Sequence, residues 1–555
     1  MLKNETLKTN DGHLSGNLFA LLIIAGIVLN FAGVFNDILE PDGTLYASIA
    51  KHSAITNDWI NLIGNGQDWL DKPHLPFWIT AISFKIFGYT AFAYKIPSFL
   101  FWLAGIYYTY LLALKLYNKT VARFAVIIYI TALHVILSNF DVRAEDYLTT
   151  LIIAATYHVF RAGEYKYSWH ILYAALYCAC AMMTKGIFVL VTIASGFIFY
   201  WILTKQWKEF LEPRWYLMFA LSFLFTLPEL YCLYIQFDLH PEKIVYGKTN
   251  VSGIRFFFWD SQFGRFFNNG PIKGKGNPLF FFHTILWAFL PWSLLLYISV
   301  VALFKKRKPV NRQSLIINFA ALISFIMFSL SRFQLPYYIL IIFPHFAIIT
   351  ANWLTDDLAL KKQSRINIML NIIFFILVLL IIVIAILLDV VYLVYLMVIT
   401  VAVLIIFVYS RKKGLAATAV KSMCFAFLLS AFLNISFYPT LMQYQSGMQA
   451  AKWLNKNKPA LNEVTMYKCI PHTSFAFYSN AEVKYADTIQ TALSNKKPII
   501  IYSEKADVDS LAEKGFNILV LHSFAYFHTS KLNAHFIMPG SRSKQLQTFE
   551  LASVN

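Results

Sequence analysis

Residues 366–386 read INIMLNIIFFILVLLIIVIAI, a run that contains no Asp, Glu, Lys or Arg. A helix of about 20 apolar residues is long enough to cross the hydrocarbon core of a membrane. The rest of the chain shares this character, since its 555 residues are 58% hydrophobic and only 14% charged. This composition excludes an ordinary soluble domain and is typical of a polytopic membrane protein.

The same criterion predicts about 13 spans along the chain. They cover approximately residues 17–35, 90–116, 121–138, 146–161, 168–183, 186–203, 214–235, 279–303, 313–330, 335–352, 366–386, 389–410 and 418–438. Most of the connecting loops are short. Two longer loops, at about 36–89 and 236–278, are expected on one side of the membrane, and the second is expected to be a mobile, glycine-containing binding loop.

Lys and Arg residues are distributed unevenly between the loops. If the N-terminus is cytoplasmic, the inner segments carry 22 Lys and Arg residues, whereas the short outer loops carry only Arg143, Lys185 and Arg332. Because cytoplasmic loops are enriched in these residues, the asymmetry predicts a cytoplasmic N-terminus. The net charge of +18 comes largely from short loops rather than from one soluble face. Nucleic-acid binding is therefore not expected.

The chain changes character after about residue 440. An amphipathic helix at 448–454, an apolar strand at 498–502, a helix at 508–514 and an apolar strand at 518–521 alternate along it. This pattern predicts an α/β domain over residues 441–555. With a cytoplasmic N-terminus and 13 spans, that domain lies outside, on the periplasmic side.

Near the start of the first outer loop, Asp42 lies one helical turn before Tyr46, with Asp37 and Glu40 close by. Ionisable groups held at a membrane are costly and usually functional. A carboxylate here could orient or deprotonate an acceptor hydroxyl, with Tyr46 beside it. Asp42 could equally be the N-cap of a helix.

A second motif, Asp71-Lys72-Pro73-His74-Leu75-Pro76, ends the same loop. Its two prolines stiffen the chain and exclude regular helix up to Lys72. A rigidly held Lys is a compact point charge that suits a lipid phosphate. The alternative is a lysine that extends from the end of a span to the membrane interface.

Four charges lie within six residues at Asp141-Val142-Arg143-Ala144-Glu145-Asp146. Residues three or four apart share a helix face, so Asp141 and Glu145 are expected to face inward together and Arg143 to point elsewhere. The alternative is a solvated loop. Lys185, Arg265 and Arg332 are further candidate anion contacts, and His283 is a candidate substrate contact within an apolar span, although each of these four could be structural.

In order along the chain, these motifs are joined by Thr184-Lys185-Gly186, Phe258-Trp259 to Arg265-Phe266, Phe289-Leu290-Pro291-Trp292-Ser293 and Leu335-Pro336-Tyr337-Tyr338. The ordered set resembles the bacterial branch of the dolichyl-phosphate-mannose-protein mannosyltransferase superfamily, in particular the undecaprenyl-phosphate aminoarabinose transferases of lipid A. The similarity runs over about residues 20–355.

The resemblance implies a GT-C-type glycosyltransferase fold over residues 1–440. By the motifs, Asp42 corresponds to the family's catalytic aspartate, Lys72 to its phosphate-contacting lysine and Asp71 to the acid before it. Glu145 corresponds to a second key acid that is usually Asp, and Asp146 is the adjacent alternative. Lys185 matches a Lys-Gly turn. The chain departs from the family pattern at His74, where a second proline is usual, and at Gln334, where a lysine is usual.

The resemblance also implies a polyprenyl-phosphate sugar donor and a lipid A, glycan or protein acceptor at the periplasmic face of the bacterial inner membrane. Lys72, Lys185 and Arg265 would stabilise the departing phosphate while Asp42 activates the acceptor, with inversion at the anomeric carbon. No metal is required for this chemistry, although the acids could bind a divalent ion. No residue is assigned as a metal ligand.

Two other functions fit parts of the same pattern. A transporter or flippase of a lipid-linked or charged substrate would also hold charges within a membrane, but it often shows two related halves, and no internal repeat is visible here. An oligosaccharide ligase or a protein O-glycosyltransferase would share the fold and differ only in its acceptor.

Overall fold

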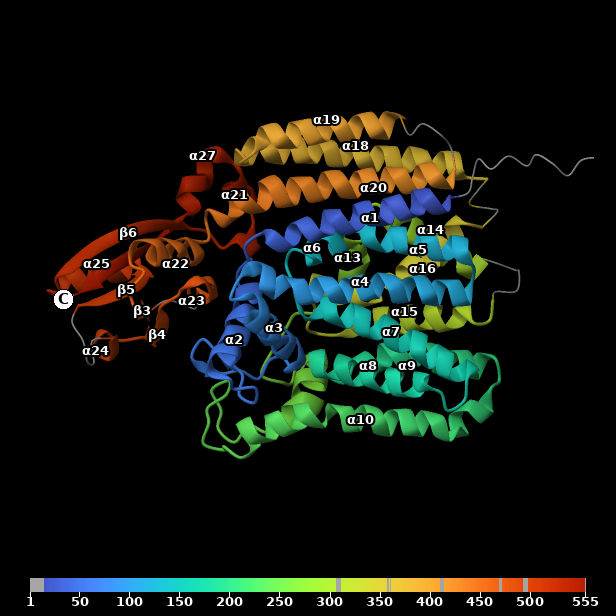
Figure 1. Cartoon of the computed structure of the whole chain (residues 1–555), viewed down its shortest axis with the longest axis horizontal. Helices are drawn as coiled ribbons and strands as arrows, with labels where there is room; N and C mark the ends of the chain where they lie inside the picture. The colour runs from blue at the N-terminus through green and yellow to red at the C-terminus, as the bar shows by residue number, and fades with distance from the viewer. Residues whose placement is uncertain are drawn as a thin grey trace, which may run out of the picture.

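The computed structural model describes residues 14–305, 311–356, 359, 361–409, 414–468, 472–492 and 498–554. A bundle of long helices makes up most of the molecule, and a smaller domain with a five-stranded sheet lies at one end of it (Figure 1). The bundle contains α1 (Gly16–Ala32), α4 (Ala91–Leu116), α5 (Lys119–Thr131), α6 (Leu133–Ser138), α7 (Ala144–Glu164), α8 (Trp169–Lys185), α9 (Val189–Leu203), α10 (Pro213–Leu233), α13 (Phe280–Ala288), α14 (Ser293–Lys305), α15 (Ser314–Leu330), α16 (Phe343–Leu354), α18 (Gln363–Leu388), α19 (Leu393–Tyr409), α20 (Leu415–Ala431) and α21 (Tyr438–Met442).

Within the described ranges, six helical stretches are long and apolar enough to cross a membrane. They are Gly16–Phe35, Ala91–Leu116, Pro213–Asp238, Pro336–Leu354, Gln363–Leu388 and Leu415–Met442. Several shorter apolar helices pack among them. The polytopic helical fold is confirmed, and the count of about 13 spans stays a prediction.

Some predicted spans are divided in the structure. The span predicted at 279–303 consists of α13 and α14, separated by residues 289–292. Pro291 lies in this break, where its missing N–H and its ring prevent a continuous helix. The second long outer loop is also more regular than expected, because residues 253–267 are helical over α11 (Gly253–Arg255), η4 (Phe256–Gly264) and α12 (Arg265–Phe267).

The first outer loop forms α2 (Asp42–Thr56), a short hairpin of β1 (Ile63–Gly64) and β2 (Gln67–Asp68), and α3 (Leu75–Phe87). Figure 1 shows α2 and α3 at the end of the bundle that adjoins the C-terminal domain. The chain passes from α1 to α2 at this end, so α1 begins at the opposite end of the bundle. The start of α1 and the C-terminal domain therefore lie at opposite ends of the bundle (Figure 1); the orientation in the membrane stays a prediction.

The C-terminal domain is built on a mixed sheet with strand order β4-β3-β5-β7-β6. Its elements are α22 (Ser446–Asn457), β3 (Glu463–Tyr467), α23 (Thr473–Tyr478), β4 (Glu482–Ala486), α24 (Ile489–Ala492), β5 (Ile499–Glu504), α25 (Lys505–Glu513), β6 (Ile518–Tyr526), α26 (Ala534–Ile537), α27 (Pro539–Arg542) and β7 (Gln547–Val554). Strand β3 runs parallel to β4 and β5, whereas β7 is antiparallel to β5 and β6. The predicted α/β character, with α22, β5, α25 and β6, is confirmed.

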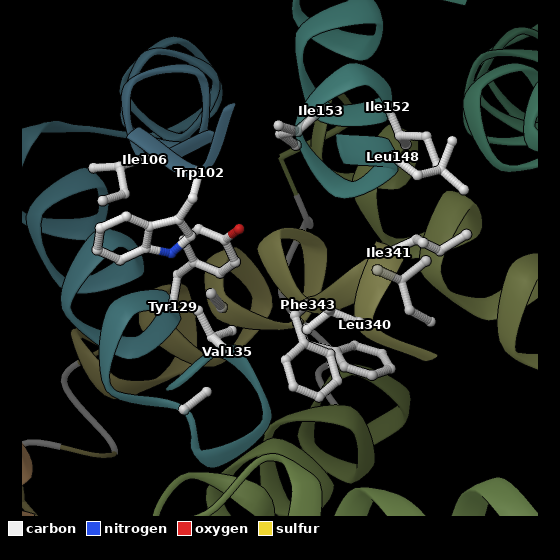
Figure 2. Close-up of a cluster of buried hydrophobic side chains, with 14 of the residues drawn as sticks. Trp102, Ile106, Tyr129, Val135, Leu148, Ile152, Ile153, Leu340, Ile341 and Phe343 are labelled. Carbon is white, nitrogen blue, oxygen red and sulfur yellow. The ribbon is translucent and has the colours of Figure 1, made fainter. Parts of the chain in front are cut away.

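The core of the bundle surrounds α7, which is buried along most of its length. Side chains from α4, α5, α7 and α16 meet there, among them Trp102, Tyr129, Leu148 and Phe343 (Figure 2). Helix α4 approaches α7 closely at Gly105, where a Cβ atom would lie 2.5 Å from the Thr150 hydroxyl oxygen. Small residues allow this kind of approach in membrane helices. The packing fixes the N-terminus of α7, and with it the acidic residues of its first turn.

Candidate active site

Asp42 and Arg143 form an ion pair at the end of the bundle that adjoins the C-terminal domain. The Arg143 guanidinium also donates to Asp141 through Nε at 2.9 Å and through Nη2 at 2.8 Å. Its centre lies 4.3 Å from the centroid of the Tyr337 ring, a cation–π distance. One guanidinium therefore holds two carboxylates, Asp42 and Asp141, that lie about 100 residues apart in the sequence, and Asp42 keeps 35% of its side chain exposed.

This geometry corrects two expectations. Arg143 does not point away from Asp141, because residue 143 is extended (φ −133°, ψ 178°) and precedes α7, so helical spacing does not apply to it. Asp42 is the first residue of α2 and Pro41 occupies the cap position, so Asp42 is not the N-cap of that helix. A carboxylate in the first turn is favoured by the helix dipole.

The second acid, Glu145, pairs with Lys185 in the interior. Both side chains are almost fully buried, and the Lys185 ammonium lies 3.8 Å from the centroid of the Tyr338 ring. A buried charge needs such partners, because desolvation without compensation is costly. The alternative that Lys185 simply extends to the interface is therefore not what the structure shows.

Asp71, Lys72 and Arg265 form a third charged group, which joins the two long loops predicted at about 36–89 and 236–278. Lys72 Nζ lies 2.6 Å from Asp71 Oδ2, and Arg265 pairs with the same carboxylate. Burial alone would raise the pKa of Asp71, but the two neighbouring cations hold it well below its usual range. Burial lowers the pKa of Lys72, and Asp71 offsets part of that effect. The group carries one net positive charge when all three members are ionised.

His74, one of the two departures from the family pattern predicted from the sequence, is fully buried against Glu229 of α10. The His74 backbone N–H donates to Glu229 Oε2 at 2.9 Å, and its Nδ1 lies 3.0 Å from Oε1. On the other side of the ring, Nε2 lies 2.9 Å from the carbonyl oxygen of Ile60. A carbonyl only accepts, so Nε2 carries a proton. These contacts tie the chain just after Lys72 to the bundle.

A cavity of about 390 Å3 lies beside these charges. Lys72, Lys185 and Arg265 line one part of it together with Asp71, and the remaining wall is largely apolar and aromatic, including Phe188, Phe256, Phe257, Phe263, Phe328 and Tyr338. Lys72 also lines a small neighbouring hollow with Tyr46 and Arg143. The cavity is therefore adjacent to the Asp42–Arg143 pair through Lys72.

The remaining predicted site residues are placed differently. The Asp146 carboxylate accepts the Arg143 backbone N–H at 2.6 Å, so it caps α7 from within its first turn. It also lines a second cavity of about 180 Å3 with Asp141, Glu145 and Tyr337. His283 and Arg332 have exposed side chains, and neither lines the 390 Å3 cavity. Their proposed substrate contacts stay predictions.

Tyr337, Tyr338 and Glu229 were not predicted as site residues. The two tyrosines lie in η5 (Pro336–Ile342) and cover the cations Arg143 and Lys185. Their signal was the Leu335-Pro336-Tyr337-Tyr338 motif, whereas Glu229 lies within an apolar helix and has no local motif. Among the residues that the structure describes, no group of three or more His, Cys, Asp or Glu side chains is arranged to hold a metal ion.

Comparisons with known proteins agree with this architecture. The family model described as dolichyl-phosphate-mannose-protein mannosyltransferase matches residues 71–232. The crystal structure of ArnT from Cupriavidus metallidurans bound to undecaprenyl phosphate superposes with a TM-score of 0.75, at 15% identity, over 97% of this chain and 98% of that chain. The predicted family resemblance is confirmed. The fold is of the GT-C glycosyltransferase type, with a C-terminal sheet domain.

Two relatives extend the resemblance in sequence. An uncharacterized protein of Aquifex aeolicus is 24% identical over 97% of this chain and 99% of its own length. The undecaprenyl phosphate-alpha-4-amino-4-deoxy-L-arabinose arabinosyl transferase of an Enterobacter species is 25% identical over 64% of this chain. That match spans 63% of the arabinosyl transferase, just under two thirds of its length.

Proposed function

We propose that this GT-C-type protein is an integral-membrane glycosyltransferase that moves a sugar from a polyprenyl-phosphate donor to an acceptor at the periplasmic face of the bacterial inner membrane. The observation that carries the proposal is the 390 Å3 cavity, whose apolar wall adjoins Lys72, Lys185 and Arg265. A polyprenyl phosphate has the matching chemistry, because it joins a long apolar chain to an anionic group.

The charges support a single displacement. As the bond between the anomeric carbon and the phosphate oxygen breaks, negative charge develops on the phosphate, and preorganised cations in a desolvated site stabilise it strongly. Arg265 and Lys72 are held in place by Asp71, and Lys185 by Glu145, so they need little rearrangement during the reaction. No covalent sugar–enzyme intermediate is needed, and one displacement inverts the anomeric carbon.

Asp42 is the proposed acceptor-activating group. Its partly exposed carboxylate pairs with Arg143, and Arg143 lines a small hollow together with Lys72, which also lines the donor cavity. Asp42 would accept a hydrogen bond from the attacking hydroxyl, and the proton as the new bond forms. Asp141 shares Arg143 and Glu145 holds Lys185, so both act by placing cations, whereas Asp146 caps α7.

We further propose that the acceptor is a lipid A-type saccharide and the donor sugar an aminopentose, on the strength of the arabinosyl transferase relatives. A glycan or a protein acceptor would use the same donor chemistry. The proposal places the N-terminus in the cytoplasm, so that the site and the C-terminal domain face the periplasm. This orientation rests on the Lys and Arg asymmetry of the loops.

The test is transfer from radiolabelled polyprenyl-phosphate sugars in membranes that contain the protein, followed by separation of labelled lipid A, glycan and protein. Lys72→Ala is expected to abolish transfer while the protein still inserts. Lys72 lines both the donor cavity and the small hollow that it shares with Arg143, the partner of Asp42. Lys166→Ala, which removes an exposed lysine paired with Glu212, is the matched control and should transfer normally.

The same assay separates the proposal from its rival. Movement of the labelled lipid across the membrane with no covalent product would favour a transporter or flippase. Near-normal transfer by Lys72→Ala would remove Lys72 from the donor site.

A further inference from the structure

The chain that leads into Asp42 is held by residues from the other end of the sequence. Gln445, which is fully buried, donates from Nε2 to the Ile38 carbonyl at 2.9 Å and accepts the Glu40 N–H at 3.0 Å. The Tyr478 hydroxyl accepts the Ile38 N–H at 2.7 Å. Backbone groups two and four residues before Asp42 thus have partners about 400 residues away along the chain.

Glu40 places a carboxylate at the centre of this contact. Its Oε1 accepts hydrogen bonds from the Ser474 backbone N–H at 3.1 Å and from the Ser474 hydroxyl. Burial raises the pKa of Glu40 to about 7, against the lowering effect of these hydrogen bonds. Burial of a carboxyl group is costly unless it is hydrogen-bonded, and among the described residues Ser474 supplies those hydrogen bonds to Glu40.

The contact continues past Asp42 into α2. The Thr473 hydroxyl donates to the Pro41 carbonyl at 3.2 Å and lies 2.5 Å from the Thr44 hydroxyl. Two helical turns further on, Lys51 donates to the carbonyl oxygens of Phe477 and Ser479 at 2.8 and 2.7 Å, near the C-terminus of α23. We refer to Gln445, Thr473, Ser474 and Tyr478 together as the clamp.

The helical bundle holds the same loop from the opposite side. Lys95 of α4 is buried, and its ammonium donates to the carbonyl oxygens of Gly33, Asn36 and Asp37 at 3.2, 2.8 and 3.2 Å. The loop from Asn36 to Pro41 therefore lies between a rigid cation of the bundle and the clamp. Asp42 follows directly, with its own carboxylate on Arg143.

We propose that the C-terminal domain is a positioning element for the transfer reaction: through the clamp it holds the backbone before Asp42 and the Thr44 side chain after it, and Glu40 is the positioning carboxyl group at its centre. The inference rests on the proposed function, in which Asp42 activates the acceptor. Catalysis depends on such placement, since a shift of about 1 Å in a reacting group can cost on the order of a hundredfold in rate. None of the four clamp residues lines the donor cavity.

The test compares Thr473→Val with Thr473→Ser. Valine keeps the shape of the side chain and removes the hydroxyl, whereas serine keeps the hydroxyl and removes a methyl group. Thr473→Val is expected to lower kcat by about tenfold with an unchanged KM for the polyprenyl-phosphate sugar. Thr473→Ser should stay close to the unsubstituted protein. Ser474→Ala removes a different hydrogen bond of the clamp and should reproduce the loss of kcat.

A double-mutant cycle with Asp42→Asn shows whether the effect passes through Asp42. If the clamp acts by placing that carboxylate, Thr473→Val should cost no further activity in the Asp42→Asn background. An equal loss in both backgrounds would mean a general structural effect and would overturn the inference. Lys484→Ala, in an exposed pair with Glu463 on the same domain, is the control, and thermal unfolding of each variant verifies that it folds.

The outcomes also distinguish this inference from the proposed function. If the unsubstituted protein transfers sugar but Thr473→Val and Ser474→Ala do so equally well, the positioning role alone fails. If the unsubstituted protein transfers no sugar from any polyprenyl-phosphate donor, the proposed function fails and the inference falls with it.

Discussion

At the residue scale, the site is organised by charged groups that each pair with two partners of opposite charge. Arg143 holds Asp42 and Asp141, and Arg265 and Lys72 share Asp71, so each key group has a partner that fixes its direction. Charges arranged in this way need little reorganisation when a charged substrate enters. The sequence motifs contained all of these residues, but the pairing between them came from the fold.

Asp42→Asn tests the central residue directly. Asparagine keeps the size of the side chain and part of its hydrogen bonding but removes the charge. Turnover is expected to fall by about a hundredfold or more, while the affinity for the donor changes little because the donor phosphate is bound by other residues. Measurement of kcat and donor affinity in the same variant checks this. Full activity would move the catalytic role away from Asp42.

At the scale of elements, the site depends on how closely helices approach in the bundle. Helix α7 carries Glu145 and Asp146 in its first turn and is packed against α4 at Gly105. A substitution that enlarges one side chain at such a contact lowers the stability of the protein, because the interior is close-packed. The position of α7 therefore links the packing of the bundle to the pairing of Glu145 with Lys185.

Gly105→Ala should separate these two helices. The added Cβ would lie 2.5 Å from the Thr150 hydroxyl, and overpacking of this kind costs about 1–3 kcal/mol. The Tm is expected to fall, and the double substitution Gly105→Ala with Thr150→Ala should restore part of it by removing the nearest atom. Gly163→Ala in α7 is the control, since a Cβ there meets nothing within 4 Å. An unchanged Tm for Gly105→Ala would show that α4 and α7 leave room for a Cβ atom between Gly105 and Thr150.

At the scale of the whole molecule, the C-terminal domain and the bundle meet through polar contacts around Glu40 rather than through an apolar face alone. The Glu40 carboxyl group is buried against Ser474 and near Tyr478 and Tyr526, with no cation among its described contacts. The protonation of one residue therefore affects the stability of the contact between the two parts.

The pH dependence follows from the raised pKa of Glu40. An unfolded Glu titrates near 4.5 and the folded group near 7, so between these values the folded protein retains a proton that the unfolded chain has lost. The contribution of Glu40 to the free energy of unfolding therefore falls as the pH rises from about 4.5 through 7. The Tm of the unsubstituted protein should fall relative to that of Glu40→Gln between pH 5 and pH 8. A constant difference would contradict the burial of Glu40, and Glu463→Gln, at a partly exposed residue of β3 that pairs with Lys484, serves as the control.

The sequence by itself determined the class of the molecule and most of the residues at its charged end. Apolar runs near 20 residues long predict membrane helices without any tertiary information, because the thickness of the bilayer sets their length. Short motifs such as Asp71-Lys72-Pro73 and the acidic segment from Asp141 to Asp146 are also local. The alternation of helix and strand after residue 440 is local as well, and it predicted the α/β domain.

Only the tertiary structure decided which of these groups act together. Arg143 contacts Asp42 about 100 residues away, Lys185 contacts Glu145 of the preceding long helix, and Ser474 reaches Glu40 across 434 residues. Local periodicity contains no signal for such pairs, because the distance between two side chains depends on how their helices pack. For that reason three features appear only in the folded molecule. They are the hydrogen bond of Glu229 to His74, the contact of Tyr338 with Lys185, and the contact of the C-terminal domain with the loop before Asp42.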